Sequence, residues 1–106
     1  MPSDRRKARL HETIKRMISE IIHQEMSRSD ALITVTDVKI SVDIQWADVS
    51  ISIFPYHKRE EIMQALNKKI GFLQFLFNKK LRIRHTPKIR FVIDSRLEAG
   101  VIDEGI

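Results

Sequence analysis

The chain has 106 residues, of which 42% are hydrophobic and 31% charged, and its 19 lysines and arginines exceed its 14 acidic residues. This length and composition predict one soluble domain over residues 1–106 and exclude a disordered chain. With no cysteine and no apolar run near the ~20 residues of a membrane span, disulfides, thiolate zinc sites and a spanning helix are excluded, as expected of a cytoplasmic protein.

The first predicted element is a long amphipathic helix that begins at Arg5 and ends near Met26. Residues 1–4 are expected to be flexible, with Ser3 or Asp4 as a candidate helix cap. Apolar side chains recur at intervals of three and four along the helix, at Leu10, Ile14, Met17, Ile18, Ile21 and Ile22. Such spacing predicts one buried face. Mixed charges occupy the remainder, so the outer side is predicted to be solvated.

Two strands follow as a predicted antiparallel hairpin. Alternation over 33–35 and over 38–40 changes phase at Thr36-Asp37, which indicates a β-bulge or two misjudged strand ends. Residues 47–53 alternate cleanly between apolar and polar, which predicts a strand with one buried face. Trp46 at its start is expected to be partly in the core; stacking of Trp46 or Tyr56 on a base is the alternative.

From Lys58 the helical period returns and continues past Gly71 to about Leu81. Gly71 is either a tolerated packing glycine or a kink that divides the helix and lets a ligand approach the backbone. Phe72 and Phe77 are expected in the core, whereas Phe75 is a candidate for exposure and contact with a partner protein. Pro87 ends the helical phase, and 89–93 alternate as a third strand.

The order helix, strand, strand, helix, helix, strand predicts an α+β fold with a three-stranded sheet and helices on one face. The order of the strands in the sheet stays open. The tail is expected to be coil pinned by Leu97 or Ile102, with residues 98–106 flexible.

Positive charge is concentrated in residues 62–93, which contain no aspartate or glutamate. The segment carries eight cations: Lys68, Lys69, Lys79, Lys80, Arg82, Arg84, Lys88 and Arg90. Without these eight the acids outnumber the bases, so the net charge of +5 comes from this segment. If the cations from Lys68 to Arg84 share one face, they form a strip that follows phosphates beside Gly71. The alternative is a generic basic surface.

Catalytic and metal sites are not predicted. His11 and His23 are about 18 Å apart along one helix at 1.5 Å per residue. His57 and His85 have no carboxylate at ligand spacing, and no Ser-His-Asp set or phosphate-binding glycine loop is present. The chain is therefore expected to be no enzyme and to need no cofactor, although a small nuclease and a protein-only adaptor remain as alternatives.

Five sequence blocks in order resemble the ribosome-binding factor A family. They are Thr34-Val35-Thr36-Asp37-Val38, Trp46-Ala47-Asp48-Val49, 66–73 around Gly71, Leu81-Arg82-Ile83-Arg84 running to Phe91, and Asp94 to Gly100. The chain departs from the family pattern at Lys69, where an alanine is usual, at 27–29 and at Phe75.

The resemblance implies a non-enzymatic type II KH-like domain that acts as a monomeric ribosome assembly factor. Such a protein binds the immature small ribosomal subunit, with its rRNA and ribosomal proteins near the neck and decoding region, and assists late rRNA processing and growth in the cold. An organellar copy is also compatible with the resemblance. The alternative is a KH-like RNA-binding module outside ribosome assembly. The RNA-binding candidates are Gly71 and the eight cations of residues 62–93.

Overall fold

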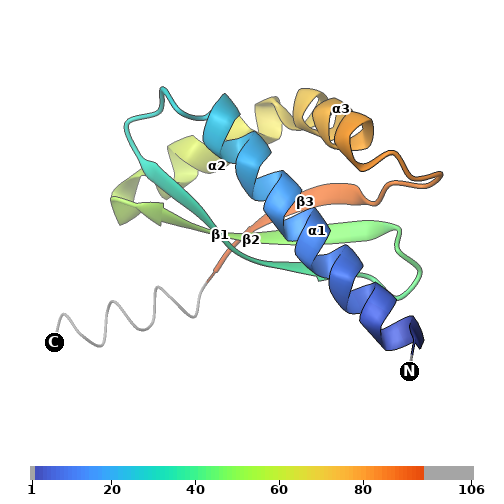
Figure 1. Ribbon diagram of the computed structural model, residues 1–106. Coiled ribbons are helices and arrows are strands. Elements are labelled where there is room, and N and C mark those ends of the chain that lie inside the picture. Colours follow the sequence, from blue (N-terminus) through green and yellow to red (C-terminus); the bar gives the residue numbers. More distant parts are fainter. Residues whose placement is uncertain (1, 95–106) are drawn as a thin grey trace, which may run out of the picture.

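The computed structural model describes residues 2–94, with side chains described from Arg5 onward. Its elements in chain order are α1 (Pro2–Glu25), β1 (Leu32–Ile40), β2 (Trp46–Phe54), the 3-10 helix η1 (Tyr56–Lys58), α2 (Arg59–Lys68), α3 (Ile70–Leu81) and β3 (Lys88–Ile93). Figure 1 shows α1 crossing the sheet diagonally, with α2 and α3 beside it. The predicted order of elements is confirmed. The predictions for Leu97, Ile102 and residues 98–106 lie outside the described residues.

The buried face of α1 follows the predicted stripe. Ile14, Ile18, Ile21 and Ile22 are buried, and Leu10 and Met17 pack against them at the edge of the core. The helix begins at Pro2, three residues before the predicted start. The side chains of Ser3 and Asp4 lie outside the described ones, so their capping role stays a prediction.

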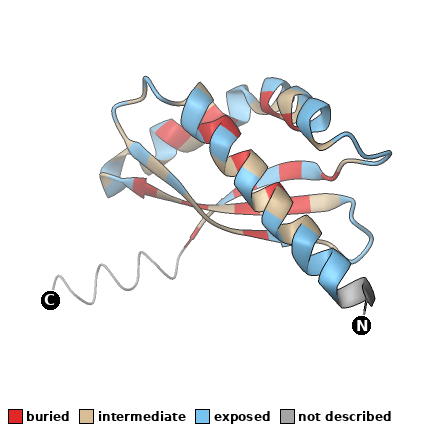
Figure 2. Ribbon diagram, in the orientation of Figure 1, coloured by how far each residue is buried: buried red, intermediate tan, exposed pale blue. Residues whose placement is uncertain are grey.

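The sheet has the strand order β1-β2-β3, with β1 antiparallel to β2 and β2 parallel to β3. The sequence leaves this order open because a parallel pair is joined by a long crossover, here α2 and α3, and has no local signature. In β2, Ala47, Val49, Ile51 and Ile53 are buried. Their alternation with half-exposed polar residues gives the sheet one face under the helices and one open face (Figure 2).

The phase change in β1 is a β-bulge. Val35 pairs with Ile51 and Asp37 pairs with Ser50, so Thr36 is the extra residue. Its hydroxyl lies 2.6 Å from Asp94 Oδ2 and 3.2 Å from Ser50 O. A hydroxyl has a single proton, and the shorter distance indicates that it donates to the carboxyl oxygen of Asp94. The bulge thereby anchors Asp94, which is only 6% exposed, where β3 ends.

The break between α2 and α3 falls at Lys69, not at Gly71. The backbone of Lys69 ends α2 and begins α3, and its N–H is shared between the carbonyls of Ala65 and Leu66. Gly71 lies within the first turn of α3 and is exposed. A methyl group on its Cα would meet no other described residue within 4 Å. Gly71 is therefore no packing glycine.

The core lies between the helix layer and the sheet (Figure 2). Leu66 from α2 and Leu73 and Phe77 from α3 are fully or almost fully buried there. The prediction for Phe77 is confirmed and that for Phe72 is wrong, because Phe72 is 49% exposed. Five residues separate the two, which turns Phe72 about 140° around the helix from Phe77. Among the described residues, no helix is long and apolar enough to cross a membrane.

Candidate nucleic-acid interface

All eight cations of the segment from 62 to 93 are exposed, but the fold divides them among three places. Lys68 and Lys69 lie at the corner between α2 and α3. Lys79, Lys80, Arg82 and Arg84 lie at the end of α3 and in the loop that follows. Lys88 and Arg90 lie on β3.

At the helix corner, Lys69 has a structural partner. Its ammonium donates to the backbone carbonyl of Glu25, 3.2 Å away, at the last residue of α1. A cation there satisfies a free carbonyl and complements the helix dipole. Lys68 and Gly71 are both exposed. The corner therefore offers two exposed cations, of which Lys69 is also bonded to α1, and backbone without a covering side chain.

The end of α3 carries the densest charge. Lys80 lies 3.6 Å from Glu20 of α1, an exposed pair of small energetic worth. Arg82 caps the helix in a left-handed conformation with φ 53°. Within the described part of the chain, the side chains of Arg82 and Arg84 have no ion-pair or hydrogen-bond partner. These two guanidinium groups are free to meet phosphate, as is the ammonium group of Lys68 at the helix corner.

Lys88 and Arg90 face the open side of the sheet, because they alternate with the buried Ile89 and Phe91. Arg90 donates to Asp48 Oδ1 at 2.7 Å and lies 4.2 Å from the centre of the Trp46 ring. Trp46 is half-buried, but it alternates with the buried Ala47 and does not pack against the core, so the prediction that it lies partly in the core is wrong. These two cations therefore lie across the sheet from the helix layer, apart from the six cations of the predicted strip, which lie between Lys68 and Arg84.

An aromatic ridge, defined here as Phe72, Phe75 and Lys79, runs along the outer side of α3. Phe75 is 56% exposed, as the sequence indicated. The two rings are nearly parallel, with centroids 6.5 Å apart, and the Lys79 ammonium lies 5.7 Å from the Phe75 ring. The ridge combines apolar rings with positive charge and has no acid nearby in the sequence.

Gln74 ties α3 to the start of β3 and was missed by sequence reasoning. Its amide accepts from the backbone N–H of Ile89 at 2.8 Å and donates to Pro87 O at 3.0 Å and to Asn78 Oδ1 at 2.9 Å. A lone glutamine in an apolar helix gives no periodic signal. Its effect is to fix the distance between the basic end of α3 and the loop from 82 to 87.

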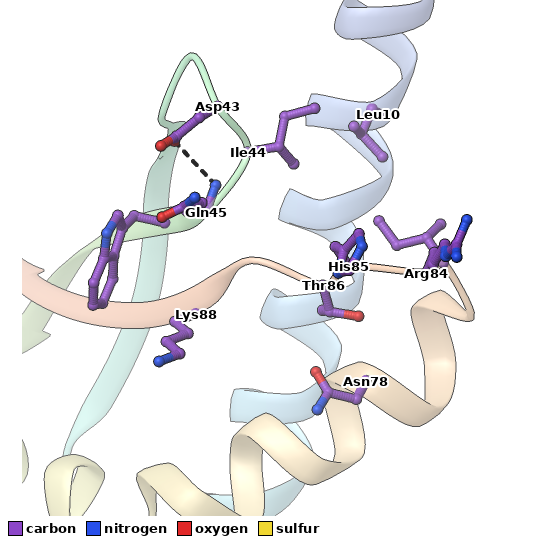
Figure 3. Close-up of a pocket in the computed structure, with 11 residues that line it drawn as sticks. Leu10, Asp43, Ile44, Gln45, Asn78, Arg84, His85, Thr86 and Lys88 are labelled. Carbon is purple, nitrogen blue, oxygen red and sulfur yellow. Dashed lines mark hydrogen bonds between the residues drawn. The ribbon is translucent and has the colours of Figure 1, made fainter.

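An open groove of about 880 Å³ lies at the end of the molecule where the β1–β2 loop meets the loop from 82 to 87. Figure 3 shows Leu10 on α1 and Ile44 on the loop on one side, and Asn78, Arg84, His85 and Thr86 on the other. Of the described residues, Asp43 is the single acid in its lining. Its carboxylate accepts hydrogen bonds from the Ser41 hydroxyl and the Gln45 backbone, and these bonds hold its pKa below the usual value.

The histidines form no metal centre. His11 of α1 bonds through Nε2 to Val38 O and lies 3.5 Å from Asp37. That contact joins α1 to the bulged strand. In the stretch from 2 to 94, no three histidine, aspartate or glutamate side chains gather closely enough to hold a metal ion.

Comparison with known proteins decides the family. The family model described as "Ribosome-binding factor A" matches residues 6–104. The chain belongs to the ribosome-binding factor A family. A relative of that name from Clostridium botulinum is 36% identical over 103 residues, covering 93% of this chain and 86% of the relative. A second, from another strain, is 36% identical over 104 residues and covers 93% and 90%.

Solved structures of ribosome-binding factor A share the fold. The crystal structure from Thermus thermophilus is 27% identical, with a TM-score of 0.72, and covers 82% of this chain and 93% of that one. A T. thermophilus homology model fitted into a cryo-EM map of a 30S complex is 25% identical, with a TM-score of 0.69, and covers 79% and 90%. The predicted family and the predicted α+β fold are confirmed.

Proposed function

We propose that this member of the ribosome-binding factor A family binds the immature small ribosomal subunit and its rRNA, and assists late processing of 16S-type rRNA. The complex described for the T. thermophilus relative supports the choice of partner. In this chain, the observation that carries the proposal is the acid-free segment from 62 to 93, whose eight cations are all exposed.

The proposed contact centres on the helix layer. Lys68, Lys79, Arg82 and Arg84 supply charge that displaces counterions from phosphates, which gives strength with little sequence reading. Gly71 lets the RNA backbone approach the start of α3, because no described side chain covers it. Lys69, Lys80 and Arg90 take part with weaker effect, since each has a hydrogen-bond or ion-pair partner. Lys88 takes part with weaker effect because it lies on β3, on the open side of the sheet.

The proposed mechanism is binding without covalent chemistry. A rigid domain that fits one conformation of precursor RNA stabilises that conformation by the binding free energy alone. The domain would act as a monomer, in the compartment where subunits mature and in the neck and decoding region of the subunit. Its contribution would be largest in the cold, where precursor RNA leaves misfolded conformations slowly. It needs no cofactor, and incubation with rRNA and Mg²⁺ is expected to leave the RNA uncut.

Co-sedimentation tests the proposal directly. The protein is mixed with precursor and with mature small subunits, and each mixture is separated on a sucrose gradient at two salt concentrations. We expect more protein with precursor subunits than with mature ones, and clear loss at the higher salt. Equal sedimentation with both particles, or none with either, would contradict the proposal.

A further inference from the structure

The groove at the end of the molecule has apolar walls that are exposed to solvent. Ile44 is 36% exposed and Ile83 is 40% exposed, and both line the groove together with Leu10 of α1. Its volume of about 880 Å³ lies in the range of small-ligand sites. The walls come from three segments that are distant in sequence, so the groove exists only in the folded chain.

Backbone strain marks the Ile44 side of this groove. In the described part of the chain, the only non-glycine residues with positive φ are Ile44, at 60°, and Arg82, at 53°. Arg82 is the left-handed cap of α3 and does not line the groove. A β-branched residue in this conformation is an outlier, and such strain concentrates at functional sites. Ile44 is held there because the Ser41 hydroxyl accepts from the backbone of its neighbours Gln45 and Trp46, and Ser41 O accepts from its own N–H. The loop thus presents an apolar side chain towards α1 at a conformational cost (Figure 3).

The polar lining favours an anion with hydrogen-bonding edges. Arg84 and Lys88 bring positive charge, whereas Asp43, the one acid among the described lining residues, already accepts two hydrogen bonds within its own loop. Gln74 donates to Asn78 Oδ1. That bond fixes the orientation of the Asn78 amide, which lines the groove and keeps its NH₂ group available as a donor.

Apolar walls, a fixed amide and two cations together match one chemical class. We propose that the groove binds one unpaired nucleotide of RNA, with its base between Ile44 and Ile83 and its phosphate near Arg84 and Lys88. Recognition of RNA through splayed single bases is common because paired bases hide their edges. This site rests on the proposed function for its choice of RNA as partner, and it adds selectivity for unpaired residues that cations alone do not supply.

An NMR titration tests the site. Isotope-labelled full-length protein is titrated with a single-stranded adenosine hexanucleotide and, separately, with inorganic tripolyphosphate. We expect the hexanucleotide to shift the backbone signals of Ile44 and Ile83 to Thr86 and the side-chain amide of Asn78. Tripolyphosphate is expected to shift signals near Arg84 and Lys88 and to leave Ile44 unmoved. Identical patterns for the two probes, or shifts confined to the aromatic ridge, would overturn the site.

Variants test the apolar walls. Ile44→Asn retains a residue that tolerates positive φ but removes the wall, and we expect roughly tenfold weaker hexanucleotide binding with an unchanged salt slope. Ile83→Asn is expected to do the same from the opposite side. Val42→Asn is the matched control: it lies in the same loop, is 97% exposed and does not line the groove. Equal affinities for Ile44→Asn, Ile83→Asn and Val42→Asn would refute the nucleotide site.

The same proteins separate this inference from the proposed function. If wild-type protein sediments with precursor subunits but the hexanucleotide does not shift the NMR signals of the groove residues, the nucleotide site is wrong and the proposed function is unaffected. If the hexanucleotide binds in the groove but the protein does not sediment with precursor subunits, the proposed ribosomal function is wrong and the nucleotide site is retained.

Discussion

At the scale of single residues, most side chains do what their sequence context indicates, and the exceptions have local causes. The exposure of Phe72 could not be predicted from hydrophobicity, because α3 carries apolar residues on several sides and only the face of Leu73 and Phe77 is buried. Ile44 gives no periodic signal, since it stands alone in a loop. Its positive φ arises from hydrogen bonds to Ser41 that only the folded loop displays.

The bulge hydroxyl provides a residue-scale prediction. Thr36→Val keeps the shape of the side chain but leaves the buried Asp94 carboxylate without the Thr36 donor. We expect the free energy of unfolding in urea to fall by about 1–3 kcal/mol. Thr34→Val, at an exposed position of the same strand, should change it by less than about 0.5 kcal/mol. Equal losses for the two variants would show that the Asp94 contact has no special weight.

Asp43 provides a pH prediction. Its pKa is lowered first by the Ser41 hydroxyl and then by the Gln45 backbone. A lowered pKa means that the carboxylate supports the loop fully above the ordinary value of about 3.9, and that this support is lost as pH falls through the folded-state pKa. Ser41→Ala should raise the pKa of Asp43 toward the ordinary value in a carboxyl NMR titration. An unchanged pKa would contradict the assigned cause.

At the scale of elements, the helices, the hairpin and the third strand follow from hydrophobic period and from Pro87. The bulge follows from one change of phase. The sequence favours a break between α2 and α3 at Gly71 because glycine is the local helix breaker, yet the break falls at Lys69, whose ammonium binds the end of α1. This tertiary contact connects residues 44 positions apart, so no local sequence pattern predicts it.

At the junction of the two helices, replacing Gly71 by alanine is predicted to raise the stability of the protein and to weaken its binding to precursor subunits. Its φ is not positive, and a methyl group there would meet no described residue within 4 Å. Gly71→Ala should therefore raise the free energy of unfolding by about 0.5–1 kcal/mol. If RNA approaches the backbone at this point, the same change should weaken co-sedimentation with precursor subunits. A variant that is more stable and binds equally well would remove Gly71 from the interface.

At the scale of the whole molecule, the distribution of charge is visible in the sequence but its geometry is not. The alternation of Lys88 and Arg90 with buried residues sends them to the open face of the sheet, away from the cations of α3. The end groove is invisible in the sequence because it joins α1, the β1–β2 loop and the loop before β3. Non-local assembly of this kind is fixed by packing, after the elements exist.

The salt dependence of binding to precursor small subunits tests the proposed RNA contact most directly. Lys79→Glu with Arg84→Glu should lower the slope of log affinity against log salt by about 1.4–1.8, since each lost phosphate contact removes about 0.7–0.9. The matched control, Arg16→Glu with Arg28→Glu, removes the same charge from exposed positions outside the acid-free segment and should keep the wild-type slope. Equal slopes for the two double variants would contradict the claim that RNA binds at the cations of this segment on the side of the helix layer.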